Sequence, residues 1–227
     1  MKRRSLITIL LLSVITLSSL AQREIRPHFY IGGKGGVSFS RVNFSPSVPQ
    51  GMIMGAVVGL QVKYSEEKHF GIIGELNFEQ RGWKESFSDN SAGLTYSRTF
   101  NFIQIPVLAN IFFGSERARF YINVGPEIGI MVSNSTKSNF DYNNPPSTIP
   151  STHHTEQYAL SIKNRFDYGI SAGLGVEVNV SKKHSIHIEG RFYYGLNNCF
   201  SSHKSDSFSS SQSMSIMANV GYFFRLK

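Results

Sequence analysis

The stretch from Gly51 to Gly82 constrains the fold more than any other part of the chain. It contains two runs in which apolar residues alternate with small, polar or charged ones, separated by the polar turn Ser65-Glu66-Glu67-Lys68. In the second run Glu75 and Glu79 share one parity and Leu76 has the other. Because side chains alternate faces along a strand, each run predicts a β-strand with one apolar and one polar face. Charges in the middle of such long strands favour an apolar face toward lipid and a charged face toward a barrel lumen.

The same alternation recurs along the chain and predicts eight strands in all. Outside the hairpin of residues 51–82, the expected ranges are about 28–40, 98–113, 118–133, 165–180, 184–196 and 213–224. Each is long enough for the ~9–11 residues that a tilted membrane strand needs. Pro106 and Pro126 fall inside two of these strands. Since proline cannot donate to a sheet ladder, we expect a bulge or a local break at each.

The connections between the predicted strands alternate in length. Short polar turns occupy residues 65–68, 114–117 and 181–183, whereas the other connections are longer and rich in Ser, Asn, Pro and Thr, the longest covering about residues 134–164. Short periplasmic turns and long surface loops are typical of outer-membrane barrels, and an even strand count then predicts that both termini are periplasmic. A soluble lipocalin-like barrel also has eight antiparallel strands, but it requires the opposite polarity of the faces.

The N-terminus has the features of an export signal. A basic start, Lys2-Arg3-Arg4, precedes an apolar run over residues 6–17 and the small-x-small sequence Ser19-Leu20-Ala21. This predicts a signal peptide at residues 1–21 and a barrel domain at residues 22–227. The alternative, a membrane anchor, is disfavoured because the apolar run is shorter than the ~20 residues of a helical span.

Composition after residue 21 agrees with a membrane barrel. Loss of the three basic leader residues leaves 20 Lys and Arg against 15 Asp and Glu, without a basic run that would indicate nucleic-acid binding. The single cysteine, Cys199, excludes an internal disulfide. The chain has 18 Phe and 10 Tyr, and several aromatic residues near strand ends, including Trp83 and Tyr96, are expected at the membrane interfaces. Plain strand propensity is the alternative explanation for these aromatic residues.

The parity of the strands places five basic and five acidic side chains, with one histidine, inside the barrel. They are Lys34, Lys63, Arg81, Arg119, Arg191, Glu75, Glu79, Glu127, Glu177, Glu189 and His187. The interior of an eight-stranded barrel is just wide enough for side chains to fill it. Because an unpaired buried charge is very costly, we predict a closed network of ion pairs with a structural role. A narrow path for ions or protons is the alternative.

No residue pattern predicts catalysis or metal binding. A serine with His69, His184, His187 or the pair His153-His154 could form a nucleophile and base, but the chain contains no Gly-x-Ser-x-Gly motif. Adjacent histidines in a Ser/Thr-rich loop, even together with His203, do not have metal-ligand spacing. We therefore expect no enzymatic activity, no metal and no cofactor.

Five segments resemble the PorT-like outer-membrane β-barrel proteins, also called the porin family. They are Gly32–Val37, Phe102–Val107, Tyr121–Pro126, Gly169–Glu177 and Gly221–Phe224. The resemblance extends over essentially the whole chain after the leader, with the segments in the same order. It implies an eight-stranded barrel in the bacterial outer membrane. The namesake of the family belongs to a protein secretion and gliding machinery, whereas most relatives have no assigned task.

Together these features predict an all-β protein, an eight-stranded antiparallel up-and-down transmembrane barrel with a filled lumen. The expected function is a non-enzymatic role in the envelope or at the surface, exerted by the extracellular loops. A component of a PorT-type secretion machinery and a narrow small-solute channel are the alternatives. The expected partners are outer-membrane lipid, the barrel-assembly machinery and periplasmic chaperones during biogenesis, and secretion-machinery proteins under the first alternative, with no nucleic acid.

Overall fold

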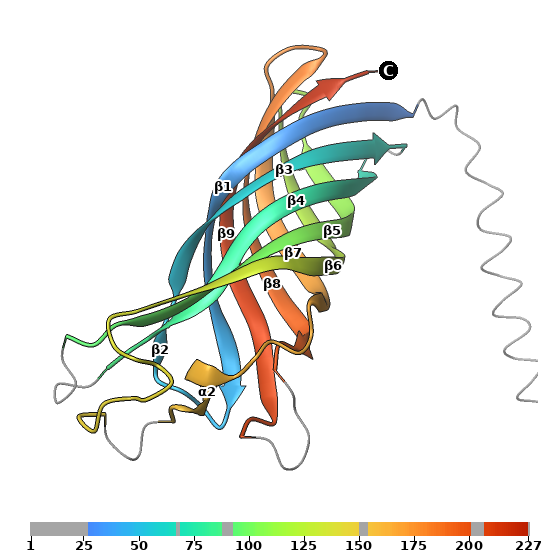
Figure 1. The fold of residues 1–227 in the computed structure, drawn as a ribbon. Coiled ribbons are helices and arrows are strands. Elements are labelled where there is room, and N and C mark those ends of the chain that lie inside the picture. The colour runs from blue at the N-terminus through green and yellow to red at the C-terminus, as the bar shows by residue number, and fades with distance from the viewer. Residues whose placement is uncertain (1–26, 67–68, 88–92, 150–153, 201–206, 227) are drawn as a thin grey trace, which may run out of the picture.

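A computed structural model describes residues 27–66, 69–87, 93–149, 154–200 and 207–226, so the predicted leader lies outside the described residues. Eight long strands form one closed antiparallel ring (Figure 1), which confirms the predicted fold class. They are β1 (His28–Ser45), β3 (Ile53–Ser65), β4 (Phe70–Glu85), β5 (Tyr96–Gly114), β6 (Ala118–Ser138), β7 (Phe166–Asn179), β8 (His184–Asn198) and β9 (Ser210–Arg225). The two-residue strand β2 (Gln50–Gly51) pairs with β4 beyond the end of its pairing with β3.

The ring has up-and-down topology. Each long strand pairs with its neighbours in the sequence, and β9 pairs with β1 to close the barrel. Closure satisfies backbone hydrogen bonds that an open sheet would leave free along its edges. Among the described residues, helical structure is limited to the short α2 (Glu156–Ala159) in the β6–β7 connection. Within the described ranges, no helix has the length and apolar character to cross a membrane.

Both prolines interrupt a ladder without bulging the strand. The β4–β5 pairing has a gap opposite Pro106, and the β5–β6 pairing has a gap opposite Pro126. In each case the register is the same on both sides of the gap, so each proline produces a local break, one of the two expected outcomes. The bulge between β5 and β6 lies instead at Asn101 and Phe102.

The two ends of the barrel differ in their connections. The β3–β4, β5–β6 and β7–β8 connections are short and lie at one end, which we call the turn end. The longer β1–β3, β4–β5, β6–β7 and β8–β9 connections lie at the other, which we call the loop end (Figure 1). The first residue of β1, His28, and the last of β9, Arg225, are both at the turn end. The alternation of connection lengths is as predicted.

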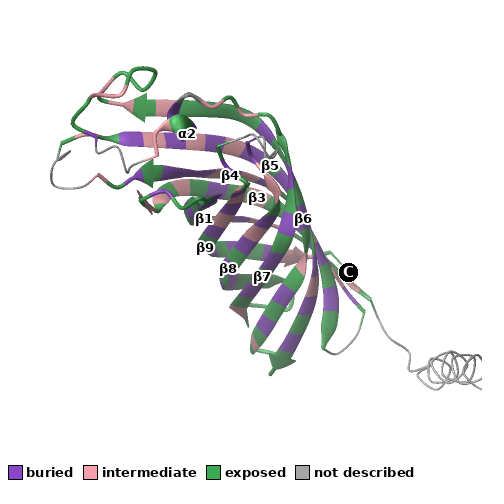
Figure 2. Cartoon of the chain, turned by 90° about the horizontal axis from the view of Figure 1, so that it is seen from below, coloured by how far each residue is buried: buried purple, intermediate pink, exposed green. Residues whose placement is uncertain are grey.

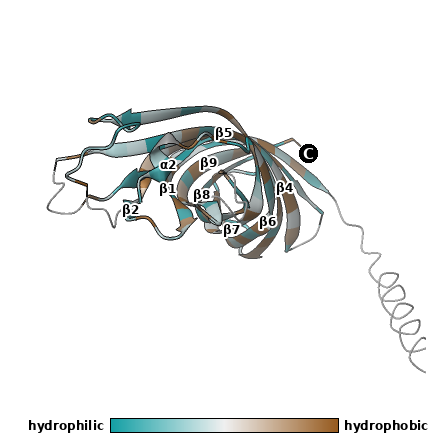
Figure 3. Cartoon of the chain, turned by 60° about the horizontal axis from the view of Figure 1, so that its bottom comes forward, coloured by the Kyte–Doolittle hydropathy of each residue, from teal (hydrophilic) through white to brown (hydrophobic). Residues whose placement is uncertain are grey.

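Along each strand, exposed and buried residues alternate (Figure 2). The exposed face is apolar, with Leu76 at 49% and Leu174 at 66% exposure, whereas the neighbouring Glu75 is 4% exposed. Hydrophobic residues accordingly form bands around the outside of the ring (Figure 3). This is the predicted polarity of a barrel in lipid and the reverse of that of a lipocalin-like barrel.

The polarity of the wall inverts near the loop end. In β1 the outward series changes from the apolar Phe39 to Arg41 and Asn43, while the inward series changes to Val42 and Phe44. Similar changes occur in β4 and β5, whereas in β6 the residues beyond Val132 are polar on both faces. We call the wall beyond Ser40, Gly82, Phe102 and Val132 the loop-end tier. With polar residues outside and aromatic residues inside, this tier has the surface of a protein in water.

Candidate functional site

Arg81 lies in the lumen on β4, next to the loop-end tier, and contacts three carboxylates. Its Nε is 2.7 Å from Glu79 Oε2, its Nη2 is 2.6 Å from Glu127 Oε1 and its Nη1 is 3.2 Å from Asp167 Oδ2. The Tyr193 ring stacks on the guanidinium, with 3.8 Å from Arg81 Cζ to the ring centroid, and its hydroxyl donates to Asp167. The five donors of a guanidinium allow one side chain to hold carboxylates from three strands together.

Neutral polar side chains complete this first group. Gln104 and Ser38 donate hydrogen bonds to Glu79, at 2.8 and 2.6 Å, and Ser171 donates to Glu127 at 2.6 Å. Ser38 and Ser171 bind Glu79 Oε1 and Glu127 Oε2, which Arg81 does not contact, whereas Gln104 shares Glu79 Oε2 with Arg81 Nε. A buried carboxylate needs such hydrogen-bond donors, because removing an ion from water costs about several kcal/mol.

A second group lies between the first group and the turn end. Arg191 on β8 binds Glu75 on β4 through two nitrogens, at 2.6 and 2.8 Å, and binds Glu189 through Nε at 2.8 Å. Lys34 on β1 also binds Glu75, at 2.6 Å. Asn77 donates to the same carboxylate at 2.9 Å. Strands on opposite sides of the ring are thereby connected through the lumen.

A third group lies near the turn end. Lys63 on β3 pairs with Glu177 on β7, and its Nζ is 4.6 Å from the ring centroids of both Tyr30 and Phe223. His187 stacks on Phe223 with 4.8 Å between centroids, and neither of its ring nitrogens has a hydrogen-bond partner among the described residues. Aromatic faces attract the Lys63 ammonium and shield it from the bulk solvent.

The structure brings the predicted lumen residues together in these three groups, which we call the lumen network. Of the eleven, ten are buried inside the ring, while Arg119 is half-buried at the turn end over the Phe112 ring. Nine of the buried ones form ion pairs. The sequence interpretation omitted Asp167, although its parity matches that of Glu177 on the same strand. It also omitted the neutral donors, which carry no charge to mark them.

Asp167 changes the charge balance of the lumen. Six carboxylates are buried there with four fully buried cations, rather than the balanced set expected. The excess lies at Arg81, which faces three carboxylates. The stability of this group therefore depends on a single guanidinium.

Glycines on neighbouring strands provide the space for the network. A Cβ at Gly173 would lie 2.2 Å from Glu189 Oε1, and one at Gly59 would lie 1.9 Å from Asn77 Oδ1. Both distances are far below a van der Waals contact. The glycine-rich polar face of the strands therefore allows long polar side chains to lie flat against the wall inside a narrow barrel.

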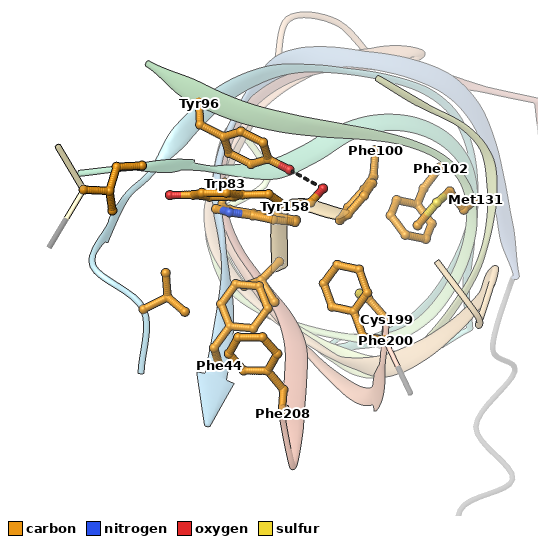
Figure 4. Packing of buried hydrophobic residues seen from close by; sticks show 13 residues of the cluster. Phe44, Trp83, Tyr96, Phe100, Phe102, Met131, Tyr158, Cys199, Phe200 and Phe208 are labelled. Carbon is orange, nitrogen blue, oxygen red and sulfur yellow. Dashed lines mark hydrogen bonds between the residues drawn. The ribbon is translucent and has the colours of Figure 1, made fainter. Parts of the chain in front are cut away.

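A cluster of apolar side chains fills the loop-end tier (Figure 4); we call it the loop-end core. Its buried members are Val42, Phe44, Val48, Trp83, Tyr96, Phe100, Phe102, Met131, Ile149, Tyr158, Cys199, Phe200 and Phe208. Trp83 contacts Phe44, Tyr96, Phe100 and Phe200 with ring centroids 5.3 to 6.3 Å apart. These are the separations of favourable edge and offset contacts.

The β6–β7 connection contributes directly to this core. Tyr158, which is 2% exposed, lies 4.4 Å from the Tyr96 ring centroid, and its carbonyl accepts from the Tyr96 hydroxyl at 3.3 Å (Figure 4). Arg98 Nη1 donates to the Leu160 carbonyl at 2.7 Å, and Gln157 donates to Glu85 at 3.0 Å. The segment from residue 157 to 160 therefore packs across the loop end of the barrel.

Two expectations about this region were wrong. The interval 134–164 is not all loop, because β6 continues to Ser138. Trp83 and Tyr96 are 0% and 2% exposed and face inward, so they do not form an interface girdle in contact with lipid. The two errors have different causes: residues 133–138 of β6 are polar on both faces and carry no alternation, whereas at Trp83 and Tyr96 the alternation continues beyond the membrane with the apolar face inward.

Burial also determines the acid–base state of groups in the loop-end core. Removal from water raises the pKa of the Cys199 thiol to about 11, although Ser213 Oγ lies 3.5 Å from its sulfur. Burial, and then the nearby Glu85 carboxylate, raise the pKa of the Tyr158 hydroxyl above its ordinary range. Both groups are therefore neutral at physiological pH, and Cys199 is a weak nucleophile.

The histidines considered for catalysis or metal binding lie in other surroundings. His69 Nδ1 is 3.0 Å from the Phe112 carbonyl oxygen, and His184 Nδ1 contacts the Tyr222 hydroxyl. His154 lies at the surface 3.6 Å from Glu156, whereas His153 and His203 are outside the described residues. Among the described residues, no group of three or more His, Cys, Asp and Glu is placed to hold a metal ion.

A closed ring of eight antiparallel strands, apolar outside and ionic inside, defines a transmembrane β-barrel. The chain belongs to the family of the outer membrane protein beta-barrel domain, whose profile matches residues 18–201. The protein is therefore a β-barrel of the bacterial outer membrane, as predicted.

Several solved outer-membrane barrels are similar in structure and distant in sequence. OprG from Pseudomonas aeruginosa has 11% identity and a TM-score of 0.48, with 89% of this chain and 97% of that chain covered. Neisserial surface protein A has 13% identity and a TM-score of 0.43, covering 85% and 95%. Ail of Yersinia pestis has 14% identity and a TM-score of 0.41, covering 86% and 99%. No curated protein sequence matches the chain significantly.

Proposed function

We propose that this protein is a closed, non-enzymatic barrel that acts at the cell surface through its loop end, with both chain ends in the periplasm. The observation that carries the proposal is the filling of the barrel along its length. Ion pairs occupy the part within the membrane, and the loop-end core, completed by Tyr158, occupies the other. A filled lumen has no continuous path for solute, so function is left to the surface beyond the membrane.

The surroundings of the histidines support a non-enzymatic role. His69, His184 and His187 pack against a backbone carbonyl, a tyrosine hydroxyl and a phenyl ring, respectively. A nucleophile and its base must lie within hydrogen-bond reach, with a third group to orient the base. None of these contacts supplies that arrangement.

Conductance recording tests the closed lumen against the small-solute channel. The purified protein is reconstituted into planar bilayers, with a general porin in the same lipid as the control for insertion. We expect no stable unitary currents, because opening a path would break several buried ion pairs at once. Stable, large unitary currents from folded protein would reject the closed barrel and favour the channel.

The resemblance to PorT-like proteins supports a second candidate, a component of a protein secretion machinery. Its motifs make close backbone contacts within the barrel, as at Gly36, where a Cβ would lie 2.1 Å from the Ala218 carbonyl oxygen. Affinity purification from solubilised outer membrane tests this candidate. Recovery of only the barrel and lipid would contradict a machinery role, whereas stoichiometric envelope proteins would support it.

A further inference from the structure

Among the described residues, the loop-end part of β6 pairs with a strand on one side only. Pairing with β7 ends at Ile130↔Phe166, and the last backbone contact between these segments is Met131 N to Arg165 O at 2.7 Å. Pairing with β5 continues to Tyr96↔Ser138. Residues 133–138 of β6 therefore form a sheet edge that no other described strand pairs with, and we call it the β6 edge.

The alternation of hydrogen-bonded pairs between β5 and β6 identifies which backbone N–H and C=O groups on this edge point away from β5. Beyond the bulge at Val132, the bond from Asn139 N to Thr95 O places residues 133, 135 and 137 in the pairs that bond to β5. The N–H and C=O groups of Asn134, Thr136 and Ser138 consequently point away from β5. Among the described residues, none of these groups has a backbone partner on that side.

The β6 edge lies in the loop-end tier and is polar. Its outward side chains, Ser133, Ser135 and Lys137, are exposed, as is Asn134. A row of unpaired backbone groups in water is a template for another strand. Proteins use such edges to bind extended segments, with main-chain hydrogen bonds providing affinity and alternate side chains providing specificity.

The charge on the edge selects the kind of segment. Lys137 lies at one end and Arg165, next to Met131, at the other, and both are exposed. Lys163 is exposed on the chain that leads to Arg165. The nearby acid, Asp141, accepts a hydrogen bond from the Asn143 amide. A second copy of this chain would bring the same positive charges to the edge, and their repulsion disfavours edge-to-edge pairing.

We propose that the β6 edge binds an extended, acidic segment of a partner protein as an added β-strand. The proposal rests on the proposed function, since it requires the loop end to face water outside the membrane. It names the surface and the chemistry of the partner: alternating polar residues with carboxylates placed opposite Lys137 and Arg165.

Two sets of variants separate backbone pairing from charge. Asn134→Pro with Thr136→Pro removes two free N–H donors that the barrel does not use, and proline is tolerated on edge strands. Asn134→Ala with Thr136→Ala is the matched control, because it removes the same side chains and keeps both donors. Lys137→Glu with Arg165→Glu reverses the charge and leaves the backbone unchanged.

The probe is a displayed library of random peptides of about ten residues, selected on the protein in lipid nanodiscs. We expect selected peptides to be rich in Asp and Glu and to bind the alanine control as well as the wild type. Binding to the proline variant should be weaker by about tenfold or more, because two hydrogen bonds are lost. The charge-reversed variant should select basic peptides, a result that does not depend on tolerance of proline.

Other outcomes would overturn the inference. One is that no peptide is selected, and another is that the selected peptides bind the proline and charge-reversed variants as well as the wild type. A third is a wild-type dimer that the proline variant abolishes, since a dimer would identify a second copy of the chain as the occupant of the edge. Conductance distinguishes the two proposals. If peptides bind a non-conducting barrel equally well with and without the β6-edge substitutions, only the proposal for the β6 edge is rejected. Stable currents would reject the closed barrel.

Discussion

At the scale of single residues, Arg81 has the largest effect on the lumen. Its guanidinium binds carboxylates from β4, β6 and β7, and its side chain is only 1% exposed. Removing one partner of a buried ion pair destabilises a protein more than replacing both partners by apolar residues, because it leaves the other charge buried and unpaired. The excess of carboxylates around Arg81 makes this group more sensitive than the balanced one around Arg191.

We predict that Arg81→Met lowers the free energy of unfolding by about 3–5 kcal/mol, because three buried carboxylates lose their cation. Urea unfolding in lipid vesicles measures this loss, with the far-ultraviolet circular dichroism of the strands as the signal, because Trp83 lies in the loop-end core and reports on that tier. Adding Asp167→Asn to Arg81→Met should restore part of the stability by removing one of the unpaired charges. Equal stability of Arg81→Met and the wild type, or no recovery in the double variant, would contradict the charge-balance argument.

Residue parity predicted which charges face the lumen but not how they pair. Glu75 and Arg191 are separated by 116 positions in the sequence, and their contact depends on ring closure and on the length of both side chains. Asp167 illustrates the same limit, because its parity was evident whereas its role appears only when β4 and β7 face each other across the barrel. Sequence patterns determine faces, and three-dimensional closure determines partners.

At the scale of the strand, the outward face must match the surroundings at each depth. Leu76 is half exposed on β4, pairs with Leu60 on β3 and lies within the apolar band. Ser97 on β5 also faces outward, but it lies in the loop-end tier. The same substitution at these two positions therefore tests where the membrane ends.

We predict that Leu76→Arg costs ~2–4 kcal/mol, as arginine does at the lipid face near the midplane, whereas Ser97→Arg costs about 0–1 kcal/mol. Unfolding in lipid vesicles measures both. If Leu76→Arg folds with wild-type stability, the assigned lipid face is wrong. If Ser97→Arg is as costly as Leu76→Arg, the membrane extends over the loop-end tier.

The strands themselves were predictable from alternation, and their loop-end extensions were not. In β1 the signal is present, since Arg41 and Asn43 follow Phe39 on the outward parity while Val42 and Phe44 appear on the inward one. One rule, apolar outward, cannot describe a strand that passes from lipid into water. The point of change can be recognised in the sequence as an exchange of polarity between the two parities.

At the scale of the whole molecule, the protein has two tiers with different driving forces. In the membrane, lipid surrounds an ionic interior, whereas beyond it a polar wall surrounds the loop-end core. The hydrophobic effect acts only where water is the alternative, so it stabilises the loop-end tier and contributes little to packing inside the membrane band. The β6–β7 connection belongs to the loop-end tier. Its packing on the loop-end core can be lost without unfolding the barrel.

Cys199 reports on that docking. It is the single cysteine, it is buried in the loop-end core, and burial raises its pKa to about 11, so the reactive thiolate is scarce at neutral pH. We predict slow maleimide labelling in the folded wild type. In Tyr158→Ala, labelling should accelerate by roughly tenfold or more, because the segment across the core opens locally.

The half-exposed Tyr142 provides the matched control, since Tyr142→Ala removes an aromatic side chain of the same connection without leaving a buried cavity. Its labelling rate should remain near that of the wild type.

The wild-type rate should rise with pH by about tenfold per unit up to about 11, since the thiolate is the reacting form. Equal rates in Tyr158→Ala and the wild type would show that the segment is not needed to cover the core. Loss of the folded barrel in Tyr158→Ala would show that the two tiers unfold as one, because a separable loop-end tier must open while the lumen network keeps the membrane band closed.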